Sequence, residues 1–131
     1  MVTSYGLGEY LAHFYPQLGT TGLQMVVWAF CIANLYLFHI MGFVNSWCHL
    51  SGKQTFTTKD NSRNNFLVGL LALGEGWHNN HHRFPRSERQ GLFWWQVDIS
   101  HYILTVMSWL GLVYDIKQPT REEITKAMEN R

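Results

Sequence analysis

An uncharged stretch constrains this chain more than any other feature of its sequence. No Asp, Glu, Lys or Arg occurs in the range Tyr10–Gly52, whereas all ten Lys and Arg residues follow it. Within the stretch, Leu23–Val44 is a mostly apolar run of 22 residues. As a helix it would be roughly 33 Å long, and a bilayer core is about 30 Å thick. We therefore expect a transmembrane helix over 23–48. The alternative is a buried helix of a soluble domain.

The polar and basic residues indicate how such a helix would be used. Gln24, Asn34 and His39 interrupt the run, and polar groups in a span usually face a bundle interior or a cavity. Basic residues lie on the C-terminal side, which the positive-inside rule places in the cytoplasm. We expect an integral membrane protein. With a formal net charge of +1, nucleic acid is not an expected partner.

Three of the seven histidines lie in the segment 78–82, which reads His-Asn-Asn-His-His and is called the histidine box below. On a helix, positions i, i+3 and i+4 share one face. Neutral imidazoles are good ligands for iron, zinc and copper, whereas protonated ones would repel one another. The box therefore predicts a metal site. The alternatives are a solvated surface tract, a purification tag or a structural zinc. Tags are terminal, and structural zinc usually involves cysteine, but Cys31 and Cys48 are isolated.

The remaining patterns predict an all-α fold in which one transmembrane helix is followed by cytoplasmic or interfacial helices carrying the box. We expect a loop over 51–65 and a helix from Phe66 to Asn80, with Pro85 ending it. Gly91–Ile116 predicts an amphipathic helix that lies on the membrane or docks on the cytoplasmic part; a second span is the alternative. The expected parts are an N-terminal segment (1–22), the transmembrane helix (23–48), a metal-binding part (49–116) and a charged tail (117–131), either a short helix or disordered.

Three segments together carry a family resemblance. They read Asn45-Ser-Trp-Cys-His49, Asp60-Asn-Ser-Arg-Asn-Asn65 and Leu73-Gly-Glu-Gly-Trp-His-Asn-Asn-His-His-Arg-Phe-Pro85. They resemble the C-terminal part of a membrane fatty acyl desaturase, most closely the bacterial and cyanobacterial Δ9 acyl-CoA or acyl-lipid enzymes of the stearoyl-CoA desaturase type. The likeness covers about residues 25 to 117, and the box with G-E-G-W before it and F-P after it is highly specific.

The resemblance implies an O2-dependent oxidoreductase of unsaturated fatty acid biosynthesis. Such an enzyme introduces a cis double bond, here at Δ9, into a fatty acyl-CoA or acyl-lipid in the membrane. A ferredoxin or a cytochrome b5-type carrier supplies its electrons. The implied cofactor is a di-iron centre held by histidines. His49, His78, His81 and His82 match its ligands, and Asn45 matches a residue that contacts the metal through water.

Two further residues are expected to support the ligands. Glu75 lies three residues before His78, so on a helix it could accept a ring N–H from a ligand histidine; the alternative is a surface carboxylate. His39 is expected in a pocket or beside the ligands rather than among them.

The sequence also departs from the family. The family's first two boxes, H-x-x-x-x-H and an earlier H-x-x-H-H, do not occur in this chain, and Gly42 stands where relatives often carry Trp. We therefore expect the C-terminal part of a complete or split enzyme, inactive alone, with part of its iron ligands missing. The alternatives are a histidine-box hydroxylase or monooxygenase acting on a lipid, and a non-catalytic membrane fragment.

Overall fold

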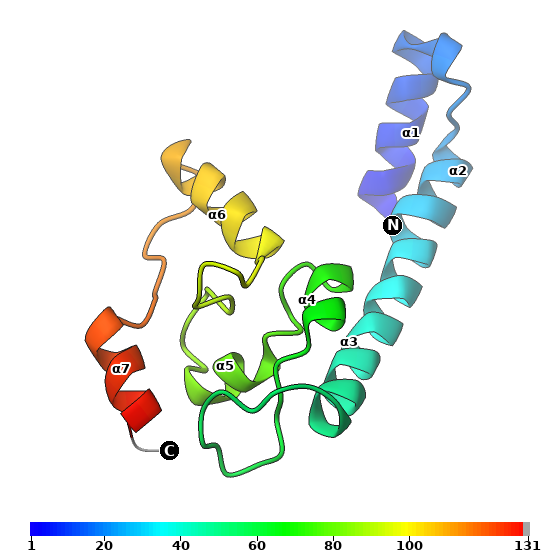
Figure 1. The fold of residues 1–131 in the computed structure, drawn as a ribbon. Helices are drawn as coiled ribbons and strands as arrows, with labels where there is room; N and C mark the ends of the chain where they lie inside the picture. The colour runs from blue at the N-terminus through cyan, green and yellow to red at the C-terminus, as the bar shows by residue number, and fades with distance from the viewer. Residues whose placement is uncertain (130–131) are drawn as a thin grey trace. The chain divides into compact units, whose positions relative to one another are not determined.

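The computed structural model describes residues 1–129, and Asn130 and Arg131 of the expected tail lie outside them. The described chain is mostly helical and contains no β-strand, only two isolated β-bridges. This confirms the expected all-α class for these residues. The helices are α1 (Val2–Phe14), a 3-10 turn (Pro16–Leu18), α2 (Gly22–Val26), a π-helical segment (Val27–Ile32), α3 (Ala33–Leu50), α4 (Phe66–Leu71), α5 (His78–Arg83), α6 (Ile99–Trp109) and α7 (Arg121–Glu129) (Figure 1).

The chain divides into two compact units, and the first comprises Met1–Met41. Here α1 and α2 lie side by side (Figure 1). Their backbones meet at two glycines, because a Cβ on Gly8 would lie 2.6 Å from the Cα of Gly22. The carboxylate of Glu9 accepts the N–H of Gly22 at 3.0 Å. Thr21 forms a capping box with Gln24 that starts α2.

Helical residues continue without a break from Gly22 to Leu50. This 29-residue helix is long and apolar enough to cross a membrane by length and composition, and it confirms the helix expected over 23–48. A π-helical turn interrupts the α-helical pattern at Val27–Ile32. There the amide of Asn34 donates to the carbonyl of Phe30 at 2.7 Å, so one of the polar residues of the run is satisfied within the helix itself.

The second unit starts at Gly42, and its core corrects one expectation. The helix expected from Phe66 to Asn80 is wrong, because the chain forms two short helices, α4 and α5, joined by a tight turn. Leu73 (φ 55°) and Gly74 (φ 124°) adopt left-handed conformations that end α4. The turn brings Gly76 against the backbone of Gly69 so closely that a Cβ at Gly76 would overlap it. Because of this turn, α5 begins as a separate helix and does not continue α4.

The amphipathic helix expected over 91–116 is shorter than its apolar pattern. The α-helix covers only Ile99–Trp109, and Asp98 caps it by accepting the N–H of His101 at 3.0 Å. The same buried carboxylate accepts the N–H groups of Gln90 and Gly91, both at 2.8 Å. Those bonds hold residues 90–98 in a turn, so this apolar sequence cannot extend the helix.

Candidate metal centre

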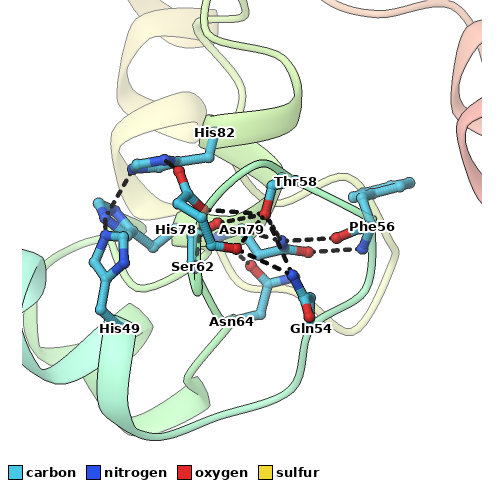
Figure 2. Close-up of polar contacts among 10 residues, drawn as sticks. His49, Gln54, Phe56, Thr58, Ser62, Asn64, His78, Asn79 and His82 are labelled. Atoms are coloured by element: carbon cyan, nitrogen blue, oxygen red, sulfur yellow. Dashed lines mark hydrogen bonds and ion pairs between the residues drawn. The ribbon is translucent and has the colours of Figure 1, made fainter. Parts of the chain in front are cut away.

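Three imidazoles converge in the second unit, from the end of α3 and from α5 (Figure 2). The Nε2 atom of His78 lies 3.2 Å from Nε2 of His49 and 3.0 Å from Nε2 of His82. One ligand nitrogen from each of the three residues lies within 4.8 Å of the others. His78 and His82 share a face of α5 at spacing i, i+4. The three residues therefore form a group that could hold a metal ion.

Backbone pairing explains how two distant segments meet. After α3 the chain loops out and returns, and Asn64 pairs antiparallel with Lys53 on one side and with Trp77 on the other. The backbone N–H and C=O of Lys53 and Asn64 exchange hydrogen bonds of 2.9 and 2.8 Å. His49 lies just before the end of α3, shortly ahead of Lys53, and His78 follows Trp77 directly, so the pairing brings both to one place.

The local environment keeps the central imidazole neutral. His78 is buried, whereas His49 and His82 are half-buried. Burial, followed by the positive charges that His82 and His49 can carry, lowers the pKa of His78 to about 4. At neutral pH its ring therefore has a free lone pair, which is the form that binds a metal.

A carboxylate that the sequence reasoning did not select contacts the group. Oδ2 of Asp60 lies 2.5 Å from Nδ1 of His82. Its other oxygen accepts the N–H of Ser62 at 2.9 Å and the hydroxyl of Thr58 at 3.0 Å. Hydrogen bonds from Ser62, ahead of those from His82 and Thr58, hold the pKa of this carboxyl well below its usual range. Asp60 opens one of the three segments that carried the family resemblance, and this position was the only sequence signal that could have indicated a role for it.

The two asparagines of the box are buried and hold the surrounding chain, and Figure 2 shows the contacts of Asn79. The side-chain oxygen of Asn79 accepts the N–H groups of Thr55 and Phe56 at 2.8 and 2.7 Å, and its amide donates to the carbonyl of Phe56 at 3.0 Å. Asn80 holds a different segment, because its amide donates to the carbonyl of Gln90 at 2.7 Å. The box residues between the histidines are therefore structural.

Asn64 completes this network from the pairing segment. Its side-chain oxygen accepts the N–H groups of Asn79 and Asn80, at 3.0 and 3.2 Å, and so satisfies the first turn of α5. Its amide donates to the side-chain oxygen of Asn80 at 2.6 Å. A side chain distant in sequence thus does the work of an N-cap for this short helix.

Other expected site residues lie outside the three-nitrogen group. The ring of His81 is centred 6.2 Å from that of His78, and its buried Nδ1 has no hydrogen-bond partner among the described residues. Glu75 accepts the amide of Gln90 at 2.9 Å, and among the described residues no bond joins it to an imidazole. The carboxylate contact with an imidazole that we expected of Glu75 is made by Asp60.

Two further expected residues belong to α3. Asn45 lies one turn before His49 on the same helix and is exposed. His39 belongs to the first unit, where it is exposed and meets the ring of Phe38 edge-on.

The donor set fits an imidazole-ligated metal. All three converging atoms are ring nitrogens. Outside this group, His81 has a buried Nδ1 with no hydrogen-bond partner within residues 1–129. Such nitrogen-rich sets suit iron, zinc and copper rather than magnesium or calcium, which prefer oxygen.

Comparison with known proteins places this sequence in a family. The sequence profile described as fatty acid desaturase matches residues 3–114. The chain belongs to the fatty acid desaturase family. It is 44% identical over 102 residues to the chloroplastic palmitoyl-monogalactosyldiacylglycerol delta-7 desaturase of Arabidopsis thaliana, a match that covers 78% of this chain and 28% of that protein. This confirms the resemblance carried by the three sequence segments.

Other relatives share the family and differ in name. Delta-9 acyl-lipid desaturase 2 of Arabidopsis thaliana is 43% identical over 118 residues, covering 90% of this chain and 36% of that protein. An acyl-CoA 5-desaturase of Anemone leveillei is 42% identical over 99 residues, covering 76% and 31%. The chain thus spans about a third of the length of these curated relatives. Their names differ in double-bond position and acyl carrier at almost equal identity, so identity alone does not select among them.

Proposed function

We propose that this chain forms the part of an O2-dependent fatty acyl desaturase that carries its last histidine box. The observation that carries the proposal is the convergence of His49, His78 and His82 in a member of this family. The reaction is the introduction of a cis double bond, at Δ9, into a fatty acyl chain. Removal of hydrogen from an unactivated methylene is beyond the acid–base chemistry of side chains, and bound iron supplies that oxidising chemistry.

The proposed iron ligands are His49, His78, His81 and His82, with Asn45 contacting the metal through water. Four imidazoles are too few for two irons, so the remaining ligands would come from a segment outside these residues. His78 is held neutral by its burial and is ready to bind without losing a proton. For His81, the buried Nδ1, which has no partner within the described part of the chain, supports a role as a further ligand.

The proposed setting is the membrane. The helix from Gly22 to Leu50 would span the bilayer. The histidine box would lie on the cytoplasmic side, because the basic residues follow the helix in sequence as the box does. A fatty acyl-CoA or acyl-lipid would be the substrate, and each CH₂ that leaves water would contribute about 0.8 kcal/mol to binding. A ferredoxin or cytochrome b5-type carrier would deliver the electrons.

A chimera tests this function. The matching region of the Arabidopsis delta-9 acyl-lipid desaturase 2, to which this chain aligns over 118 residues, is replaced by this sequence. The chimera is produced in a host that lacks its own desaturase, and membrane fatty acids are analysed by mass spectrometry. We expect a new unsaturated acyl chain, and the position of its double bond reports regiochemistry.

Matched variants make the result interpretable. The same chimera with His82→Ala should reach the membrane at the same level and form no product, whereas His13→Ala, in α1, should leave product formation unchanged. An alcohol in place of the alkene would identify a hydroxylase. A membrane-inserted chimera that yields neither product, next to an active parent enzyme, would refute the proposal.

A further inference from the structure

The contact between Asp60 and His82 has a direction fixed by chemistry. An ionised carboxylate only accepts hydrogen bonds. The 2.5 Å contact between Oδ2 of Asp60 and Nδ1 of His82 therefore requires the proton of the imidazole to be on Nδ1. In a neutral ring, Nε2 then has its lone pair free. That atom is the one that faces Nε2 of His78 at 3.0 Å.

The carboxylate is itself held so that its two oxygens have separate tasks. Oδ1 is occupied by the N–H of Ser62 and the hydroxyl of Thr58. Oδ2 is left for His82. The two oxygens are chemically equivalent, but the bonds from Ser62 and Thr58 fix the plane of the carboxylate, so that one oxygen always faces His82.

The helix that carries the histidine also holds the loop that carries the aspartate. Thr55 and Phe56 are bound by the fully buried side chain of Asn79, three residues before His82 on α5. The hydroxyl of Ser62, a buried residue, receives a bond from the same Asn79 amide at 3.4 Å. The chain from Thr55 to Ser62 is thus fixed at both ends to the element whose imidazole Asp60 contacts.

We propose that Asp60 is a positioning residue of the metal centre, which fixes the Nδ1–H tautomer and the ring orientation of His82 so that Nε2 faces the metal. This inference rests on the proposed function, because the task that it assigns to the free lone pair is to bind a metal. Carboxylate partners of this kind commonly orient metal-binding histidines and raise their basicity. The simplest alternative is that Asp60 only closes the local turn with Ser62 and Thr58.

Asp60→Asn separates the two roles. The Ser62 N–H keeps the amide oxygen on its side, so the NH₂ group faces Nδ1 of His82. Two donors cannot bond each other, and His82 is forced to the Nε2–H tautomer, whose proton blocks the metal position. Thr58→Val is the matched control, because it removes a turn bond to Oδ1 and leaves the contact of Oδ2 with His82 in place.

The first readout needs no metal. The 131-residue chain is labelled with ¹⁵N-histidine in detergent micelles, and NMR assigns the tautomer of His82 at neutral pH. We expect Nδ1–H in the wild-type chain and in Thr58→Val, and Nε2–H in Asp60→Asn. An Nε2–H tautomer in the wild-type chain would overturn the proposal even if the variant failed to fold.

The second readout is binding of Co²⁺ alone, followed by its visible absorption. Asp60→Asn should raise the apparent Kd by about 10–100-fold, the usual effect of losing such a partner, while Thr58→Val stays near wild type. Equal weakening by both variants would leave Asp60 as a turn residue and overturn the proposal. If the wild-type chain binds no Co²⁺ although His82 is the Nδ1–H tautomer, the metal-positioning role of Asp60 is overturned. The proposed function is then decided separately by the chimera, in which the parent enzyme supplies the remaining ligands.

Discussion

Replacing Asn79 by Ala should release the loop that holds Asp60. The wild-type side chain accepts the N–H groups of Thr55 and Phe56 and donates to the Phe56 carbonyl. Phe56 is fully buried, so its N–H and C=O would lose their partner away from water. Each such group costs about 1–3 kcal/mol, which sums to roughly 2–6 kcal/mol for the two. Thr55 is only partly buried, and water can replace its bond.

Hydrogen exchange in detergent micelles measures this loss directly, because exchange reports local opening. About 2 kcal/mol corresponds to roughly 30-fold, so protection of the Phe56 amide should fall by at least that factor. Amides of α6 should keep their protection. Asn61→Ala, at an exposed position of the same loop, is the control and should change little. A fall below about threefold at Phe56 would show that Asn79 does not hold the loop, and the reasoning would be wrong.

Three further outcomes can be checked by denaturation of the detergent-solubilised chain. Since burial lowers the pKa of His78 from 6.5 to about 4, the unfolded chain binds the proton first. The free energy of unfolding should therefore fall by up to about 3 kcal/mol as pH drops from 6.5 to 4, and then level off; His78→Gln should flatten that part of the profile. Gly76→Ala should destabilise by about 1–3 kcal/mol, because its Cβ would overlap the backbone of Gly69. A Cβ at Gly42 would meet nothing within 4 Å among the described residues, so Gly42→Ala should be neutral or stabilising by up to about 1 kcal/mol; equal effects would contradict the packing argument. Phe56→Ala should cost about 3–5 kcal/mol because it empties a fully buried site, and an unchanged midpoint would place that ring outside the core.

The features of the fold that the sequence predicted are those set by local pattern. The long apolar helix could be predicted from the absence of charged residues over Tyr10–Gly52, since that absence is visible in the run itself. The break between α4 and α5 could not be predicted in this way. Gly74 and Gly76 occur there, but isolated glycines are tolerated within a helical pattern. The break depends on the left-handed conformations of Leu73 and Gly74 and on a contact between Gly76 and Gly69, which only tertiary packing reveals.

The same distinction applies to the candidate site. Spacing within the box placed His78 and His82 on one face, and the family resemblance added His49. Spacing also suggested Glu75 as the carboxylate partner, because a single helix would place it one turn from His78. The structure pairs Glu75 with Gln90 instead, since Glu75 lies in the turn before α5 and not on one helix with His78. Asp60 reaches His82 across 22 residues of sequence, and no periodicity reports a contact through a loop.

The brevity of α5 limits how the histidine box can be transplanted. At six residues the helix is far below the length at which isolated peptides hold a helical shape in water, and its first N–H groups are closed by Asn64. A synthetic peptide copying only the box would be an unstructured histidine-rich peptide with no preferred metal geometry. A metalloprotein designer who borrowed this motif would have to transfer the whole stretch from His49 through the box as one cassette, with the asparagines kept as carefully as the histidines.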